Sequence, residues 1–250
     1  MRISIITVVL NNNKYIESCI NSVLNQTYDN KEYIVIDGGS TDGSVDIIEK
    51  NSDKIDKWIS EPDKGIYDAM NKGIKMSTGE IIGILNSDDY YESNNVISTV
   101  VKEFQDKNVD SVFADLVFVK RDDLQRIIRY YKSSNFSTNK FSYGWMPAHP
   151  TFFVKRHCYD RYGLFKTDYR IAADYELLVR FLAKHKISFS YIPQIVIKMR
   201  TGGVSTKSIK STWTLNNEII RACRENGIET NIIKVYSKYF LKIFEFFDRP

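Results

Sequence analysis

Apolar runs of strand length alternate with helical periods over the first 120 residues of this 250-residue chain. Residues 3–10 are largely apolar and predict a buried strand, and the runs 33–36, 81–85 and 111–119 predict strands of the same kind. Between these runs, apolar residues recur at i, i+3 and i+4, which predicts amphipathic helices. Strands that alternate with helices indicate an α/β fold with a mostly parallel central sheet flanked by helices.

The pattern changes after Lys120. Residues 126–132 predict an edge strand, 133–143 a polar loop and 151–154 a short strand. One further helix is marked by apolar residues at helical spacing, namely Tyr175, Leu178, Val179 and Leu182. Because no Pro- or Gly-rich linker separates the two halves, we expect one continuous domain that is followed by a C-terminal helical extension.

Composition narrows the class of protein. Hydrophobic residues make up 43% and charged residues 26% of the chain, which excludes disorder, collagen and coiled coil. The three cysteines form no CxxC pair, so a disulfide framework and a cysteine zinc site are not expected, and a reducing compartment fits. No apolar run reaches the roughly 18 residues that span a bilayer, and the N-terminus lacks a signal-peptide cleavage site. We therefore expect a cytoplasmic protein.

The net charge of +4 is carried by residues 200–250, which hold nine Lys or Arg against five Asp or Glu. A nucleic-acid binder would carry its basic stripe through the main domain, so no nucleic-acid partner is expected. In the tail, Lys234, Lys238 and Lys242 recur every four residues, opposite Phe240, Phe244 and Phe247. This pattern predicts a basic amphipathic helix over 232–247 that lies on a membrane surface. Packing of its aromatic face on the main domain, or on a second subunit in a homodimer, is an equal alternative.

Three carboxylates lie directly after predicted strands. Asp37 ends the strand at 33–36, and Asp88 and Asp89 follow the strand at 81–85. Because ligands bind at the carboxyl ends of strands in open α/β sheets, we expect these side chains in one crevice. Adjacent acids repel each other and oxygen ligands suit Mg²⁺ or Mn²⁺, so Asp88 and Asp89 predict a metal site on a diphosphate.

Structural alternatives exist for each acid. Asp37 is also typical of a turn, and Asp88 and Asp89 of a helix N-terminus. Asp174 opens the helix marked by Tyr175, where a capping role is the simplest interpretation of the residue by itself. The chain has no GxxxxGK, and its glycines do not fit GxGxxG, so those two nucleotide-binding loops are excluded.

Four segments in this order resemble the inverting family-2 glycosyltransferases of the GT-A fold. The segments are residues 3–11, 35–44 with Asp37-Gly38-Gly39-Ser40-Thr41-Asp42-Gly43-Ser44, 60–73 with Asp63-Lys64-Gly65-Ile66-Tyr67-Asp68, and Asn86-Ser87-Asp88-Asp89. The resemblance is to the bacterial branch that builds exopolysaccharide, O-antigen and capsule units, and it covers about residues 1–205. It implies a GT-A domain over 1–205, with a nucleotide-sugar-binding half at 1–120 and an acceptor half at 121–205, and leaves 206–250 as the extension.

The resemblance also implies roles for single residues. It implies a nucleotide-sugar donor, usually a UDP-sugar, with Mn²⁺ or Mg²⁺ on its diphosphate. Thr7 and Asp37 would hold the nucleobase and ribose, and Asp88 would touch the ribose or the metal, with Asp89 as the metal ligand. The donor pocket would be lined by Asp63, Lys64, Gly65, Tyr67, Asp68 and Asn71.

On the acceptor side, Asp174 matches the position of the catalytic base in the family. His149 resembles a position near the diphosphate or the acceptor, although a loop histidine without a role explains it equally well. Gly202 and Gly203 resemble a loop that closes over the donor phosphates.

The function implied is a metal-dependent, inverting hexosyltransferase that uses a saccharide acceptor, usually lipid-linked, in surface polysaccharide assembly. Such an acceptor implies a peripheral position on the inner face of the cytoplasmic membrane. A nucleotidyltransferase is the first alternative, and it would normally carry a Gly-rich basic loop after the first strand, where this chain has Asn11, Asn12 and Asn13. The second alternative is a catalytically inactive sugar-nucleotide-binding protein.

Overall fold

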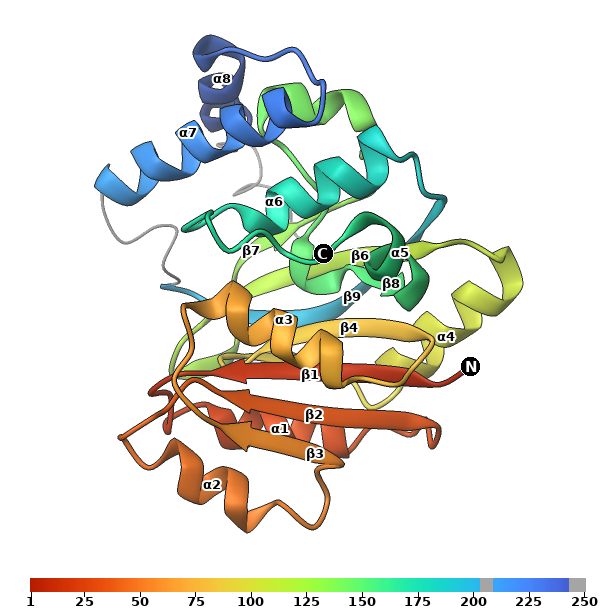
Figure 1. Ribbon diagram of the computed structural model, residues 1–250, viewed down its shortest axis with the longest axis vertical. Coiled ribbons are helices and arrows are strands. Elements are labelled where there is room, and N and C mark those ends of the chain that lie inside the picture. The colour runs from red at the N-terminus through yellow and green to blue at the C-terminus, as the bar shows by residue number, and fades with distance from the viewer. Residues whose placement is uncertain (203–208, 243–250) are drawn as a thin grey trace.

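The computed structural model describes residues 1–202 and 209–242. Its strands are β1 (Ile3–Val9), β2 (Lys31–Asp37), β3 (Lys57–Ser60), β4 (Ile81–Asn86), β5 (Asp89–Tyr91), β6 (Ser111–Lys120), β7 (Asp123–Tyr131), β8 (Phe153–Lys155) and β9 (Phe189–Arg200). Within the described chain they form one nine-stranded sheet in the order β3-β2-β1-β4-β8-β6-β9-β5, with β7 beside β6 (Figure 1).

The helices cover both faces of this sheet. They are α1 (Ile16–Leu24), α2 (Ser44–Lys50), α3 (Ile66–Met76), α4 (Val96–Lys107), α5 (Arg156–Tyr162), α6 (Ala173–Leu178), α7 (Ile209–Glu225) and α8 (Ile232–Lys242), with 3₁₀ turns η1 (Thr138–Tyr143) and η2 (His149–Thr151) and a π-helical segment η3 (Val179–Lys184). In Figure 1, α3 crosses the near face of the sheet and α1 lies behind it. The predicted α/β class with flanking helices is confirmed.

The first four strands of the sheet path run parallel, so their carboxyl ends share one edge. The register places Asp37 beside Val9 and Ser60, and it pairs Asn86 with Val8. The loops after β1, β2, β3 and β4 therefore leave the sheet together. This edge, which we call the carboxyl edge, is where the ligand site of an open α/β sheet is expected.

Alternating side chains of β1 divide the core into two layers. Ile6 and Val8 pack with α3, α5 and α6 on one face of the sheet, whereas Ile3, Ile5 and Val9 pack with α1 and α4 on the other. Burial on both faces explains why these parallel strands read as continuous apolar runs in the sequence.

Some elements were not predicted, namely β3, β5, β9 and α5. The longest of these, β9, carries Pro193 in its middle. Pairing between β9 and β6 shifts register there, from Ala114 opposite Ile192 to Asp115 opposite Ile195. Because proline has no N–H to donate to a ladder, a strand accommodates it at such an irregularity, and the strand pattern of the sequence is interrupted.

The two C-terminal helices share the core with the main domain. Cys223 of α7 and Val235 of α8 are fully buried in the same layer as α6. Lys238 is only 4% exposed, and a Cβ placed on Gly144 would lie 3.2 Å from its Nζ. The prediction of an exposed lysine stripe is therefore wrong at Lys238, because this lysine faces η1 and its neighbours.

Lys234, the first lysine of the predicted stripe, is half-buried. The side chains of the remaining positions, Phe240, Lys242, Phe244 and Phe247, lie outside the described residues, and the boundary at residue 206 stays a prediction. In the described part of the chain, no helix has the length and apolar character needed to cross a bilayer.

Candidate active site

Asp37 ends β2 at the carboxyl edge, and its side chain is fully buried. Its Oδ2 accepts hydrogen bonds from the backbone N–H groups of Gly39 and Ser40 and from the hydroxyl of Ser60, at 2.7 to 3.0 Å. Its Oδ1 is buried without any partner. A buried carboxylate oxygen that lacks a hydrogen bond is unfavourable, so Oδ1 is a ready acceptor for a donor group on a ligand.

The loop after β3 packs against the turn that follows Asp37. A Cβ placed on Gly38 would lie 2.3 Å from Oδ2 of Asp63, so a side chain at this position would displace the Asp63 carboxylate. Asp63 accepts a hydrogen bond from the N–H of Gly65 at 2.8 Å, and Asp68 accepts one from the N–H of Lys64 at 3.0 Å. The predicted pocket residues 63–68 and Asp37 therefore meet on one side of the carboxyl edge.

Asp89 is the most enclosed acid of the predicted metal pair. It is 0% exposed, and neither carboxylate oxygen has a hydrogen-bond partner. Burial, and next the Asp88 carboxylate, raise the pKa of Asp89 well above its usual range, while the Arg200 charge, the Arg200 backbone N–H and the Asn86 side chain, which lie nearby, lower it. Two adjacent carboxylates, one buried and unpartnered, fit a hard divalent cation, whose binding would supply the missing interactions.

Arg200, at the end of β9, holds the backbone of this acidic turn. Its Nη1 donates to the carbonyl oxygen of Asp88 at 2.6 Å, and its Nη2 donates to Ser18 Oγ at 2.9 Å. The guanidinium lies over the rings of Tyr15 and Tyr90. Arg200 is only 3% exposed. The sequence did not single it out, because the residue pattern of a strand does not show which of its charged side chains is buried.

Asp174 lies in the first turn of α6, across the sheet edge from the acidic turn. The residue before that helix is Ala172, so Asp174 is not the N-cap, and its Oδ1 accepts the N–H of Tyr175 at 2.7 Å. Its Oδ2 lies 3.1 Å from Nδ1 of His149. His149 and Asp174 are thus in direct contact, which neither interpretation of His149 in the sequence predicted.

A small cavity of about 30 Å³ connects this pair to β4. Its polar lining comes from His149, Asp174 and Asn86, and the Oδ1 atom of Asn86 is buried without a partner. The remaining walls are apolar: Met70, Ile84, Pro150, Phe152, Tyr159, Phe165, Leu177 and Leu178. A space of this volume holds about one or two water molecules, so it shows where the polar groups of Asn86, His149 and Asp174 converge and is not itself large enough for a sugar.

Two predicted pocket residues instead tie the Asp174 loop to α3. The hydroxyl of Tyr67 donates to the carbonyl oxygen of Ile171 at 2.5 Å. The amide of Asn71 donates to the carbonyl oxygen of Phe165 and accepts its N–H, at 2.8 and 3.0 Å. Both groups are used within the protein, which keeps the loop before Asp174 next to the predicted donor pocket.

The remaining predicted residues lie less directly at this site. Thr7 is fully buried in β1, where its hydroxyl contacts Tyr33 and Cys19. Gly202 lies exposed beside Arg121, whose guanidinium donates to its carbonyl oxygen at 3.4 Å. Gly203 is outside the described residues. The ligand roles of all the residues named here stay predictions.

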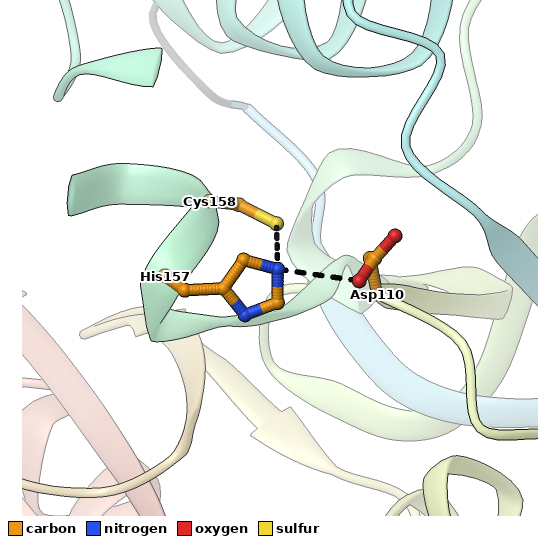
Figure 2. A group of neighbouring side chains, drawn as sticks. All are labelled: Asp110, His157 and Cys158. Carbon is orange, nitrogen blue, oxygen red and sulfur yellow. Dashed lines mark hydrogen bonds and ion pairs between the residues drawn. The ribbon is translucent and has the colours of Figure 1, made fainter. Parts of the chain in front are cut away.

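A different group of metal-type ligands lies at the opposite edge of the sheet. Asp110, His157 and Cys158 come together where β6 begins (Figure 2). Oδ1 of Asp110 lies 3.3 Å from Nε2 of His157, whose side chain is 57% exposed. This surface contact is separate from the acidic turn, and it provides a histidine–aspartate contact with which that of His149 and Asp174 can be compared.

Comparison with known proteins agrees with this geometry. A sequence profile of the family described as Glycosyl transferase family 2 matches residues 4–162, more than half of the chain. A PGL/p-HBAD biosynthesis glycosyltransferase of Mycobacterium bovis is 25% identical over 207 residues, which cover 81% of this chain and 78% of the relative.

Two solved structures share the architecture. S. aureus TarS 1-349 in complex with UDP-GlcNAc has a TM-score of 0.67 at 18% identity, over 92% of this chain and 68% of TarS 1-349. The mannosyltransferase PcManGT of Pyrobaculum calidifontis, in complex with GDP-Man and Mn²⁺, has a TM-score of 0.65 at 21% identity, over 90% of this chain and 63% of that one. At these identities the likeness shows the fold alone, and the GT-A fold that the motifs predicted is confirmed.

Proposed function

The chain belongs to glycosyl transferase family 2, and from this premise we propose that it transfers a hexose from a UDP-sugar to a saccharide hydroxyl, with inversion at the anomeric carbon. One observation carries the proposal. Buried carboxylate oxygens without partners, on Asp37 and Asp89, lie at the carboxyl edge of the sheet, and Asp174 lies beyond the Asn86 cavity. Such oxygens are costly in the free protein and are explained by a ligand that pairs with them.

The donor nucleotide would lie between β2 and the loop after β3. The free Oδ1 of Asp37 would accept a hydrogen bond from the nucleobase or a ribose hydroxyl. Lys64, which is exposed beside this loop, would supply positive charge toward the diphosphate. The proposal of a UDP-sugar rests on the resemblance of the motifs, and a GDP-sugar is the alternative that an experiment must separate.

Asp88 and Asp89 would hold a divalent cation, Mn²⁺ or Mg²⁺. Their carboxylates are the oxygen ligands that these cations prefer, and Arg200 fixes the turn that presents them. When bound, the cation would offset the negative charge that develops on the departing diphosphate.

In the transfer step, Asp174 would act as the general base. Its carboxylate accepts the proton of the acceptor hydroxyl while that oxygen forms a bond to the anomeric carbon of the donor sugar. The bond between the anomeric carbon and the diphosphate oxygen breaks, and UDP leaves with both electrons of that bond. Attack from the face opposite the leaving group inverts the anomeric centre. The bound pose needs Asp174 ionised and within hydrogen-bond reach of the hydroxyl.

The acceptor that we propose is a lipid-linked saccharide in surface polysaccharide assembly. Two isoleucines at the start of α8 support a position at a membrane surface: Ile232 is 55% and Ile233 is 78% exposed, and Lys234 follows them. Apolar side chains next to a lysine suit the interface of an anionic membrane. Membrane contact through these isoleucines replaces the earlier hypothesis of contact through the whole lysine stripe, because Lys238 is buried.

The direct test is a donor panel. Purified full-length protein is incubated with Mn²⁺ and a set of UDP- and GDP-sugars, and release of the nucleoside diphosphate is measured with and without saccharide acceptors. We expect UDP release from at least one UDP-sugar, and an anomeric configuration in the product opposite to that of the donor. Turnover of GDP-sugars alone would overturn the UDP assignment, and a product that keeps the donor configuration would overturn inversion.

The two alternatives give different results when the panel also includes UTP with a sugar 1-phosphate and a thermal-shift measurement. A nucleotidyltransferase would release pyrophosphate from UTP and a sugar 1-phosphate. An inactive binding protein would be stabilised thermally by a nucleotide sugar without releasing UDP.

A further inference from the structure

His149 is in direct contact with the candidate base, Asp174. A role near the diphosphate does not explain this contact. Nδ1 of His149 lies 3.1 Å from Oδ2 of Asp174, while Oδ1 of the same carboxylate accepts the N–H of Tyr175. The carboxylate is therefore held at both oxygens. The side chains of His149 and Asp174 are 31% and 16% exposed, so solvent screens this contact less than it screens a surface pair.

The turn that carries His149 is held by hydrogen bonds on both sides of the histidine. Thr151, two residues later in η2, uses its hydroxyl to accept the N–H of Ala114 and to contact the carbonyl oxygens of Ala114 and Ala148, at 2.7 to 3.0 Å. The N–H of Ala148 donates to Ser133 Oγ at 3.2 Å. The histidine is thus attached to the central strand β6, and a ring on such a support is well suited to orient a neighbouring group.

We propose that His149 is a positioning residue, which pairs with Asp174 and keeps its carboxylate turned toward the acceptor hydroxyl. This role rests on the proposed function, since it assigns His149 to the base of that reaction. It differs from the role suggested by the motifs, in which His149 contacts the donor diphosphate. If His149 acts only through Asp174, its loss slows transfer and leaves donor binding unchanged.

Two variants of His149 and one control variant separate these roles. His149→Ala removes the nitrogen that contacts Asp174. His149→Asn places an amide nitrogen close to where Nδ1 lies, so it restores the contact without the ring. His157→Ala is the matched control, because it removes a histidine that pairs with Asp110 at 3.3 Å at the other edge of the sheet.

We expect His149→Ala to lower kcat by about 10- to 100-fold, as displacement of a catalytic group by about 1 Å does, with the donor KM within about twofold of wild type. His149→Asn should recover most of the loss, and His157→Ala should behave as wild type. The double variant of His149→Ala and Asp174→Asn should be no slower than Asp174→Asn alone, because a positioning residue has no effect once its carboxylate is gone.

Specific results overturn the proposal. An increase in donor KM at unchanged kcat, or a loss that adds to that of Asp174→Asn, would assign His149 to the donor. Unchanged kcat in His149→Ala, with an active wild type and an impaired Asp174→Asn, would reject the positioning role alone. A wild-type protein that transfers no sugar would reject the proposed function, and the positioning role with it. Melting temperatures of all variants, measured in parallel, identify any loss of activity caused by unfolding. If His149→Ala unfolds, the kcat of His149→Asn tests the proposal, because this variant keeps the contact with Asp174.

Discussion

Nη1 of Arg200 donates a 2.6 Å hydrogen bond to the backbone carbonyl oxygen of Asp88, 112 residues earlier in the chain. Through this bond the end of β9 fixes the turn that carries Asp88 and Asp89. The same guanidinium reaches Ser18 of α1 and lies over Tyr15 and Tyr90. The acidic turn is therefore attached to a helix and a distant strand before any cation binds.

Replacing Arg200 should destabilise the protein strongly. Arg200→Met keeps the length of the side chain but leaves the Asp88 carbonyl without its buried donor and removes the cation beside the Asp89 carboxyl. We expect the free energy of unfolding to fall by about 3 kcal/mol, as when one partner of a buried charged contact is removed. Urea denaturation measures this change. Arg221→Met is the matched control, because Arg221 pairs with Asp168 at the surface and should contribute about 1 kcal/mol or less. Equal losses in the two variants would contradict the anchoring role.

Binding of UDP should depend on a divalent cation. Without one, no cation links the carboxyls of Asp88 and Asp89 to the diphosphate or offsets the repulsion between the acidic turn and the diphosphate. We expect titration calorimetry to give an affinity at least about tenfold, or ~1.4 kcal/mol, weaker in EDTA than in Mn²⁺. Asp89→Asn should lose the effect of Mn²⁺, whereas Asp122→Asn, at an exposed acid paired with Lys14, should keep it. The same affinity for UDP in EDTA and in Mn²⁺ would refute the metal assignment.

Asp174→Asn should separate binding from transfer. The amide keeps the shape of the side chain but cannot take a proton, so UDP binding should change by less than about twofold while transfer falls by roughly two to four orders of magnitude. Steady-state kinetics with a saturating donor measure the fall. Near wild-type transfer would leave Asp174 with a structural role only, as an acceptor for the N–H of Tyr175.

Glu32 gives the protein a specific sensitivity to acid. Although burial raises its pKa, hydrogen bonds from Ser4, Thr78 and Lys57 lower the pKa of Glu32 to about 2, from a usual 4.5. A carboxyl whose folded pKa is depressed stabilises the fold above its unfolded pKa, and this contribution is lost as pH falls through the folded value. We expect Glu32 to account for up to about 3 kcal/mol of stability, lost between about pH 5 and pH 2.

Comparing Glu32→Gln with wild type checks this prediction. The variant should be less stable at pH 7, and the difference in the free energy of unfolding should shrink steadily from pH 5 to pH 2. A difference that does not change with pH would mean that Glu32 contributes through packing and neutral hydrogen bonds only.

The parallel half of the fold could be predicted because its signals are local. Asp37 follows a strand that is apolar throughout, and the carboxyl ends of parallel strands meet at one edge, so its position at that edge follows from periodicity. The loop of Asp63 lies beside it because β3 pairs with β2, and β3 was not predicted. The same reasoning placed Asp89 at this edge after β4.

The position of Arg200 and the contact of His149 could not be predicted in this way. Arg200 reaches Asp88 only because β9 pairs with β6 and β5, and these pairings join segments that are about 80 to 110 residues apart. His149 and Asp174 lie on separate short helices, whose relative position is set by packing around the cavity. Helical spacing likewise put Lys238 on one face of α8 but did not show that this face meets η1, where the apolar stem of lysine can be buried.

The last prediction concerns the exposed start of α8. If Ile232 and Ile233 insert into a membrane interface, the double change to serine should weaken sedimentation with anionic liposomes by more than tenfold, since burying each isoleucine contributes about 2 kcal/mol. The melting temperature should stay close to wild type, because both side chains are exposed in the free protein. Val235→Ala provides the matched comparison. Val235 is fully buried three residues along the same helix, so this variant should melt earlier and sediment as wild type does.

The alternative that these isoleucines contact protein makes the opposite forecast. A homodimer held together through this surface would dissociate in the Ile232 and Ile233 double variant, which gel filtration detects, and neither form would sediment with liposomes. Because α8 is already packed on the main domain through Val235 and Lys238, the exposed isoleucines have no further role in holding the helix in place. Weaker sedimentation of the double variant without a change in its melting temperature is therefore specific to membrane contact. Dissociation of a dimer, with no sedimentation of either form, would overturn the membrane proposal.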